Sequence, residues 1–406
     1  METGQEWIMA TYRVREDRAL LKKRAESIAI GLTVGSWTEM AVTRRAEVKR
    51  HAGIVADIRV VEDGAKNEVI AELSIAYPAA NLTATAAALL TTVFGKLSMD
   101  GEIRLVDLTL PNAWARQFGG PRFGVTGLRE RTGVRQRPLL MSIFKACVGL
   151  DLAELTAAYR DQALSGADLI KDDEIFFSEE YATPEQRAAA YAEAGRQVYE
   201  TTGHHARYAV NLTGPVGALR ERALRLREAG ADALLFNVFA YGLDVLNELA
   251  QDPDVALPIL AHPAVAGALY GSATHGIAAS LLLGQLVRLC GADVAIYPSP
   301  YGSVTLDKPE GERLRRYLSV DNGLKRVMPA PSAGIHPGLV PQIVSDAGLD
   351  VILNAGGGIH GHPSGPIAGG QAFRAAIAAV MEGEDLAVAC QRSEPLSQAL
   401  DHWGKT

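Results

Sequence analysis

The stretch of sequence that decides the fold is Gly166-Ala167-Asp168-Leu169-Ile170-Lys171-Asp172-Asp173-Glu174. It is a short, largely apolar run that predicts a buried strand, and it ends in one lysine and three carboxylates. Alternate side chains of a strand share a face, so Lys171 and Asp173 are expected to point the same way, and Glu174 joins them where the strand ends. With the helical segment that follows, this run forms one β/α unit of a larger pattern.

The same β/α unit occurs eight times after Pro138. The candidate strands begin near Leu139, Ala167, Ala206, Ala233, Pro258, Ala292, Arg326 and Asp350. Each is followed by a segment rich in Ala, Leu, Glu and Arg, which predicts an amphipathic helix. Eight such units in about 250 residues predict a TIM (β/α)8 barrel. The barrel is expected over residues 126–406, with Asp385–Thr406 as a C-terminal helical tail.

The N-terminal part shows a different pattern, the β-α-β-β-α-β order of a ferredoxin-like α+β domain. Strands are expected at Glu6–Val14, Ile54–Glu62, Glu68–Tyr77 and Ile103–Leu110, and helices at Asp17–Gly31 and near Thr83–Val93. This small domain is predicted to span residues 1–125. Its boundary with the barrel is expected in the Pro- and Gly-rich stretch Pro111–Gly133, within which Phe118-Gly119-Gly120-Pro121 has few signals of regular structure.

Composition restricts the classes of function. A chain of 406 residues with 48% hydrophobic and 21% charged residues is long enough for two globular domains. Its net charge of -7 argues against a nucleic-acid partner, which needs a clustered basic face, and favours a small-molecule substrate. No apolar run is long enough for a signal sequence or a membrane span, so a cytoplasmic protein is expected.

The three cysteines do not predict a disulfide framework or a zinc cluster. Cys147, Cys290 and Cys390 are widely spaced and odd in number. Each lies in or beside an apolar stretch, so each is expected to be buried as a packing residue.

Polar or glycine-rich groups end nearly every expected barrel strand, at the rim where barrel enzymes carry their chemistry. They are Lys145, Lys171–Glu174, Asn211, Asn237, His262, Ser332–Gly334 and Gly356–Gly358. The loops after strands 7 and 8 of such barrels often present backbone N–H groups to a phosphate, and glycine permits the close approach. Ser332, Gly334, Gly356 and Gly357 therefore predict a phosphate site.

Two carboxylates flank one amine at the end of the second barrel strand. Hard oxygen ligands of this kind suit Mg²⁺, which keeps positions for water and substrate oxygens. A cationic Lys171 would repel the ion. From the residues alone, a plain salt bridge between Lys171 and its acidic neighbours remains an alternative.

The stretch Gly166–Glu174 resembles the activation motif of the RuBisCO superfamily, in which this lysine takes up carbon dioxide and becomes a carbamate. The resemblance covers nearly the whole chain and is closest to the RuBisCO-like, type IV enolases of methionine salvage. It is carried as well by Gly31–Thr38, Leu90–Lys96, Pro138–Lys145, Leu234–Gly242 and Asn354–Pro363. Long matches in both expected domains are more specific than any short motif.

The resemblance implies an isomerase, an enolase that converts 2,3-diketo-5-methylthiopentyl-1-phosphate to 2-hydroxy-3-keto-5-methylthiopentenyl-1-phosphate. An N6-carboxylysine at Lys171 would replace a cation by an anionic oxygen ligand, so that Lys171, Asp173 and Glu174 hold one Mg²⁺ per subunit. Lys96 is implied as the base that removes the C1 proton. The residues implied in substrate binding are Lys145, Lys171, Asp172, Asp173, Glu174, His262, Ser332, Gly334, Gly356 and Gly357.

The loop around Trp37 and Thr38 resembles a RuBisCO segment that is donated by a neighbouring subunit. The resemblance therefore implies a homodimer whose active sites lie at the subunit interface, with the small domain of one chain over the barrel of its partner.

Several departures argue against a carboxylase. Cys147 stands where the RuBisCO motif has a second lysine, Gly31 where it has a glutamate, and Thr92 where it has an asparagine; the loop Pro298–Ser303 has no lysine. The alternatives are another RuBisCO-like isomerase or enolase that acts on a different phosphorylated ketose, and a catalytically dead interaction protein. The latter predicts a broken metal triad, whereas Lys171, Asp173 and Glu174 are all present in the sequence.

Overall fold

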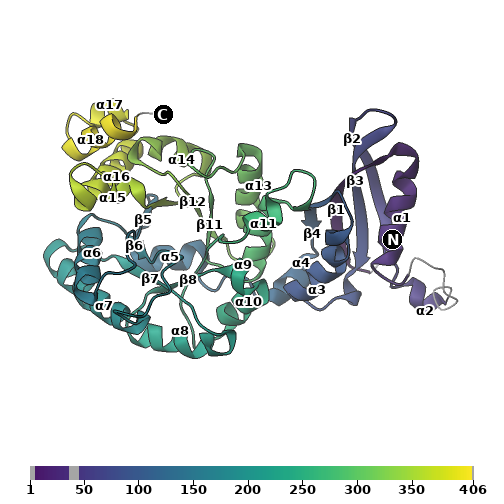
Figure 1. The fold of residues 1–406 in the computed structure, drawn as a ribbon, viewed down its shortest axis with the longest axis horizontal. Coiled ribbons are helices and arrows are strands. Elements are labelled where there is room, and N and C mark those ends of the chain that lie inside the picture. The colour runs from purple at the N-terminus through teal and green to yellow at the C-terminus, as the bar shows by residue number, and fades with distance from the viewer. Residues whose placement is uncertain (1–4, 36–44, 405–406) are drawn as a thin grey trace.

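The structure is a computed structural model, and it describes residues 5–35 and 45–404. A small domain and a barrel lie side by side, with α3 (Ala86–Leu90) of the small domain against α10 (Leu243–Gln251) of the barrel (Figure 1). Within the described ranges, no helix is both long and apolar enough to cross a membrane.

The small domain is built on a sheet with the strand order β10-β4-β1-β3-β2. Its own strands are β1 (Trp7–Asp17), β2 (Ile54–Asp63), β3 (Glu68–Pro78) and β4 (Ile103–Thr109), and its helices include α1 (Leu21–Gly31), α2 (Ala46–Lys49) and α3. The order 4-1-3-2 of its own strands is that of the expected ferredoxin-like domain, which is confirmed. The fifth strand, β10 (Gly276–Ile277), comes from the barrel part of the chain and pairs parallel with β4.

The segment between the two domains contains short helices on either side of an irregular stretch. The helices are α4 (Asn112–Ala115), η6 (Arg116–Phe118) and α5 (Gly124–Thr132), and residues 119–121 between η6 and α5 have no regular secondary structure. Its glycines serve tight turns between short helices: at Gly124, with φ +60°, an added Cβ would lie 2.6 Å from the Arg326 carbonyl oxygen. Val125 and Leu128 of α5 pack against the interior of the barrel. The boundary at residues 125 and 126 stays a prediction.

The barrel has the eight parallel strands that the repeat predicts, each beginning within two residues of the expected position. They are β5 (Leu139–Ile143), β6 (Leu169–Lys171), β7 (Arg207–Asn211), β8 (Ala233–Phe236), β9 (Ile259–Ala261), β11 (Val294–Pro298), β12 (Met328–Ser332) and β13 (Ile352–Ala355). They follow one another around the sheet in the order β12-β11-β9-β8-β7-β6-β5-β13. The side chain of Asn354 donates to Ser332 Oγ at 3.0 Å and joins the ends of β13 and β12.

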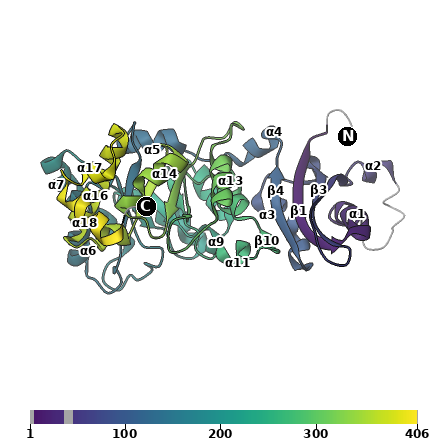
Figure 2. The same ribbon diagram turned by 90° about the horizontal axis from the view of Figure 1, so that it is seen from above.

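Helices surround the barrel strands, as Figure 1 shows. The longer ones are α6 (Leu152–Leu164), α7 (Pro184–Thr202), α8 (Leu219–Glu228), α10, α13 (Lys308–Ser319), α14 (Val340–Ala347) and α16 (Gly365–Glu382). The chain closes with α17 (Leu386–Ala389) and α18 (Glu394–Trp403), which confirms the helical tail. Both views place α18 at the end of the barrel far from the small domain (Figures 1 and 2).

The three cysteines are free thiols, as expected, but their burial differs. Cys147 and Cys290 are buried. The expectation of burial is wrong for Cys390, which is partly exposed beside α17 and whose Sγ contacts the Ala387 carbonyl oxygen at 3.1 Å.

Candidate active site

Strand β6 delivers the lysine and the two carboxylates to one place. Lys171 ends the strand with its side chain 1% exposed. Its Nζ lies 3.7 Å from Glu174 Oε2 and donates to the Asp172 carbonyl oxygen at 3.0 Å. The chain beyond the end of β6 therefore brings the Glu174 carboxylate to the Lys171 amine.

Lys145 joins this group from the loop after β5. Its Nζ lies 2.5 Å from Asp173 Oδ2. Gly356, at the end of β13, makes room for its stem, since an added Cβ there would lie 3.0 Å from Lys145 Cε. Three neighbouring strand ends, those of β13, β5 and β6, therefore build this side of the site.

His262 faces the same carboxylate from the end of β9. Its Nε2 lies 3.4 Å from Glu174 Oε2, and its Nδ1 accepts from the Ala264 N–H at 3.2 Å. Because Nδ1 is an acceptor, the proton of the neutral ring is on Nε2 and points toward Glu174. Burial, reinforced by the charge of Lys171, lowers the pKa of His262 to about 2. The contact with Glu174 is therefore made by a neutral imidazole and is not an ion pair.

Burial also controls the charges of the lysine and of its acidic neighbour. It lowers the pKa of Lys171, against the opposing effect of Glu174 and Asp173. Burial alone would raise the pKa of Glu174, but Lys171 and a backbone hydrogen bond hold it below its usual value. Glu174 is thus an anion at neutral pH, and the neutral, nucleophilic form of the Lys171 amine is favoured relative to a free lysine.

Two buried amides hold the backbone of this group, and sequence reasoning gave them no role. Asn211, at the end of β7, and Asn237, after β8, each donate from Nδ2 to the Glu174 carbonyl oxygen at 3.1 Å. Asn211 also reaches the Asp173 carbonyl oxygen at 3.4 Å. The only sequence signal was that each amide follows a barrel strand.

Asp172 lies differently from its neighbours. Its carboxylate is fully buried and accepts from the Tyr208 hydroxyl at 2.7 Å, from Arg187 Nη2 at 3.2 Å and from the Asn211 N–H at 3.0 Å. The strand alternation that aligns Lys171 with Asp173 turns Asp172 to the opposite face. The Asp172 side chain thus holds β6, β7 and α7 together, and its expected role in substrate binding stays a prediction.

The expected phosphate loops lie side by side at the ends of β12 and β13. Gly334 and Gly357 are exposed, whereas Ser332 is half-buried and Gly356 is buried. Gly334 has φ +73°, and nothing lies within 4 Å of a Cβ added to Gly357. The hydrogen bond from Asn354 to Ser332 ties the two loops together. Exposed glycine backbone beside a serine hydroxyl is an arrangement that accommodates a phosphoryl group.

Lys96 lies apart from this group. It follows the π-helix η4 (Thr91–Gly95) in the small domain, is exposed, and borders a hollow of about 220 Å³ beside α1. Over residues 5–35 and 45–404, no hydrogen bond or ion pair joins Lys96 to the Lys171 group of the same chain. Trp37 and Thr38, which were expected to reach a neighbouring subunit, lie outside the described residues.

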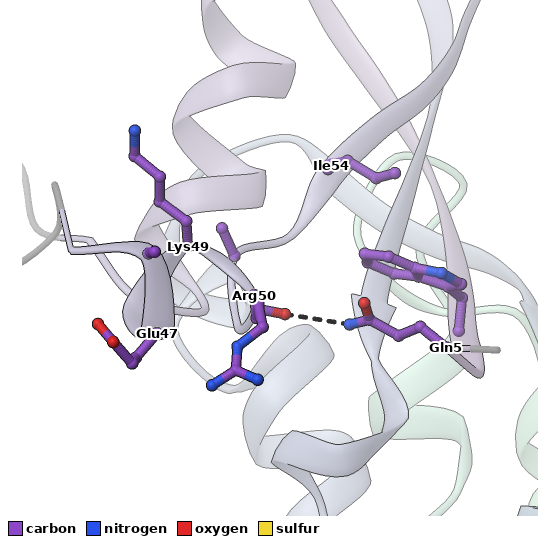
Figure 3. A pocket seen from close by; sticks show the side chains of 8 residues that line it. Gln5, Glu47, Lys49, Arg50 and Ile54 are labelled. Atoms are coloured by element: carbon purple, nitrogen blue, oxygen red, sulfur yellow. Dashed lines mark hydrogen bonds between the residues drawn. The ribbon is translucent and has the colours of Figure 1, made fainter. Parts of the chain in front are cut away.

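A larger hollow, of about 690 Å³, lies elsewhere on the small domain between β1, α2 and β2 (Figure 3). Gln5 Nε2 donates there to the Arg50 carbonyl oxygen at 3.0 Å, while Glu47 and Lys49 point in different directions. No acid and base converge among the described lining residues. Volume alone does not make this hollow an active site.

The Lys171 group has one acidic side chain fewer than a metal site with three acidic ligands. Within the part of the chain that the structure describes, no three His, Cys, Asp or Glu side chains gather into a metal-binding cluster. Asp173 and Glu174 supply two carboxylates, and the third group beside them is the amine of Lys171. A carbamate on that amine would supply the missing oxygen ligand.

Comparisons with known proteins agree with this architecture. Residues 1–114 match the N-terminal domain of the ribulose bisphosphate carboxylase large chain, and residues 124–403 match its catalytic domain. The chain belongs to the ribulose bisphosphate carboxylase large-chain family.

Individual relatives place the chain more narrowly within that family. It is 51% identical over 405 residues to a 2,3-diketo-5-methylthiopentyl-1-phosphate enolase of Geobacillus kaustophilus, with 98% of each chain covered. Its structure matches that of a rubisco-like protein (MtnW) from Alicyclobacillus acidocaldarius with a TM-score of 0.95 at 57% identity, over 98% of this chain and all of the other. The octameric Rubisco of Pyrococcus horikoshii matches with a TM-score of 0.91 at 29% identity, over 100% of this chain and 95% of the other.

Proposed function

We propose that this chain is the enolase of methionine salvage that converts 2,3-diketo-5-methylthiopentyl-1-phosphate to 2-hydroxy-3-keto-5-methylthiopentenyl-1-phosphate. The proton at C1 is removed and the C2 oxygen gains a proton, so the reaction is a keto-enol isomerisation. The observation that carries this function is the group of Lys171, Asp173 and Glu174 at the barrel rim, in a chain about half identical to enolases of this name.

We propose Mg²⁺ as the cofactor, held by Asp173, Glu174 and a carbamate on Lys171. The fit is supported by the two carboxylates beside Lys171 and by the lowered pKa of the Lys171 amine. When bound, Mg²⁺ supplies a Lewis acid for the charge that develops on the diketone oxygens.

The other residues bind and orient the substrate in this proposal. Lys96 is the base that takes the C1 proton. Lys145 Nζ forms a salt bridge with Asp173. In this proposal, Lys145 exchanges that partner for a substrate oxygen. His262 offers a neutral N–H donor at the same rim, and the backbone around Ser332 and Gly357 receives the phosphate.

A homodimer with shared active sites would bring Lys96 of one subunit to Lys171, Asp173 and Glu174 of the other. Exposed apolar side chains in both domains support this arrangement. At the barrel rim they are Val148, Ile175, Phe177, Tyr181, Val216 and Val265. In the small domain, Met99 is 81% exposed and lies three residues beyond Lys96. Exposed apolar side chains surround the barrel site, and the proposed base, Lys96, lies in the small domain. This arrangement fits a second copy of the chain that covers the barrel rim.

One departure from the carboxylase pattern, Cys147, has a physical explanation. Cys147, in place of a lysine, is buried, and burial raises the pKa of its thiol to about 11. It is therefore a neutral group at physiological pH and cannot provide the positive charge that a lysine would. The chain keeps Lys171, Asp173 and Glu174 but lacks this second cation. In this proposal, the missing cation favours enolisation over carboxylation.

The test is direct. The diketone phosphate, incubated with the protein, Mg²⁺ and bicarbonate, should show the ultraviolet absorbance of the enol and exchange its C1 proton in heavy water. If a different phosphorylated ketose is enolised and the diketone is not, the chain is another RuBisCO-like isomerase. The free thiols Cys147, Cys290 and Cys390 fit the reducing cytoplasm, where we place the enzyme.

A further inference from the structure

Two irregularities of the small domain meet at a single hydrogen bond. In the antiparallel pairing of β1 with β4, Thr11 lies opposite Asp107 and Tyr12 opposite Leu105, so Val106 is an extra residue that forms a bulge. The helix that leads to Lys96 changes from α3 into the π-helix η4. Bulges and π-helices disturb regular pairing, and both occur preferentially next to functional sites.

The bond between them runs from Tyr12 to the backbone of Val93. The Tyr12 hydroxyl lies 2.5 Å from the Val93 carbonyl oxygen and 2.7 Å from the Tyr77 hydroxyl. A carbonyl only accepts, so the single proton of Tyr12 goes to Val93, and Tyr77 donates to Tyr12. Both tyrosines are fully buried, and burial raises the pKa of each, so both keep their protons.

This bond holds the helix three residues before Lys96. The start of the same helix is fixed from the barrel, where the Asp244 carboxylate accepts from the Ala86 and Ala87 N–H groups, each at 2.8 Å. The helix is thus anchored at its beginning by Asp244 and inside its π-turn by Tyr12. The direction in which Lys96 leaves the helix depends on both anchors.

We propose that Tyr12 is a positioning residue for Lys96, which it orients through the Val93 carbonyl. The inference rests on the proposed function, in which Lys96 is the base. A base must lie within about 3 Å of the proton it abstracts, and a displacement of about 1 Å can cost up to about 10²-fold in rate. The bulge in β4 sets the position of Tyr12, and the π-helix η4 presents the Val93 carbonyl that Tyr12 holds.

The chain offers a matched control in Tyr77. Tyr12→Phe removes the donor to Val93, whereas Tyr77→Phe removes a hydroxyl of equal burial and leaves that donor in place. Tyr12→Phe should lower kcat for C1 proton exchange about tenfold, with KM unchanged because the substrate-binding residues lie in the barrel. Tyr77→Phe should keep kcat within about twofold. Equal kcat values for the two variants would overturn the proposal.

A double variant separates positioning from stability. Tyr12→Phe leaves both the Tyr77 hydroxyl and the Val93 carbonyl unpaired, and each unpaired buried group destabilises the fold. The double variant Tyr12→Phe/Tyr77→Phe leaves only the carbonyl unpaired, so it should fold more stably than Tyr12→Phe and yet show the same fall in kcat. If kcat instead recovers with stability, the role of Tyr12 is structural.

A second cycle links the effect to Lys96. If Tyr12 acts through Lys96, adding Tyr12→Phe to Lys96→Ala should cause no further loss of exchange, and multiplicative losses would overturn the proposal. Failure of the proposed function is distinguishable, because the wild-type protein itself would then catalyse no exchange, whereas wild-type exchange in Lys96→Ala would refute only Lys96 as the base. Unchanged kcat in Tyr12→Phe beside an inactive Lys96→Ala would refute only the positioning role.

Discussion

Replacing Asn237 by alanine is expected to weaken the metal site without removing a metal ligand. The Glu174 carbonyl oxygen accepts from Asn237 and from Asn211, each at 3.1 Å. Both amides are buried, so water cannot take the place of a lost donor. In Asn237→Ala, one of these two hydrogen bonds to the Glu174 carbonyl is lost, and the Glu174 backbone gains freedom that binding must then remove.

The magnitude follows from the hydrogen bonds. A net contribution of about 1 to 1.4 kcal/mol for one buried hydrogen bond corresponds to roughly a fivefold to tenfold change in affinity. Groups that orient a ligand typically contribute about 10–100-fold to metal affinity. Because Asn211 keeps its bond, we expect about a tenfold weaker Kd for Asn237→Ala. Asn211→Ala should be more severe, since Asn211 also contacts the Asp173 carbonyl oxygen at 3.4 Å.

The assay is a Mn²⁺ titration followed by electron paramagnetic resonance, in buffer that contains bicarbonate and no substrate. Asn354→Ala is the matched control, because Asn354 also lies at a strand end but donates to Ser332 Oγ. It should leave the metal Kd unchanged and raise KM for the phosphorylated substrate. An unchanged Kd in Asn237→Ala, or an equal loss in Asn354→Ala, would refute the reasoning.

Three further predictions concern the two lysines. The pKa of Lys171 is lowered by burial, so its neutral amine forms at lower pH than that of a free lysine; the rate of activation by carbon dioxide should rise with pH and level off below the ordinary lysine pKa of about 10.4, as stopped-flow activation assays can show. A plateau above that value would contradict the burial argument. Lys96→Ala should lose about 10² to 10⁴-fold in C1 proton exchange while still binding Mn²⁺; weakened metal binding would mean that Lys96 is part of the metal site. Mixing inactive Lys96→Ala chains with inactive Lys171→Ala chains should restore up to about a quarter of wild-type activity if subunits exchange randomly. No recovery, with heterodimers verified by mass spectrometry, would show that each site is built within one chain.

The repeat of apolar runs was sufficient to predict the barrel, because strand burial and helix amphipathicity are local properties of the chain. Strand alternation likewise aligned Lys171 with Asp173. The same alternation turns Asp172 away, and its expected substrate contact came only from the resemblance of the whole stretch. In the Pro- and Gly-rich stretch before the barrel, the short helices on either side of Phe118–Pro121 were not predicted, since turns between short helices use the same residues as irregular loops.

The hydrogen bonds that support the site residues could not be predicted from local sequence patterns. Tyr12 and Val93 are 81 residues apart in sequence, and their contact depends on a bulge and a π-turn that leave no clear sequence signal. Asn237 is 63 residues from Glu174, and which carbonyl it meets is set by how β6, β7 and β8 align. Such contacts depend on strand register between distant segments, which a single sequence does not reveal.

The measurement that tests the central claim most directly is C1 proton exchange of 2,3-diketo-5-methylthiopentyl-1-phosphate in heavy water, followed by nuclear magnetic resonance. Three samples are compared: the wild-type protein with Mg²⁺ and bicarbonate, the same protein after both are removed, and Lys171→Ala with both present. The account predicts rapid exchange in the first sample and none above the uncatalysed rate in the other two. Full exchange without metal and carbon dioxide, or in Lys171→Ala, would contradict it.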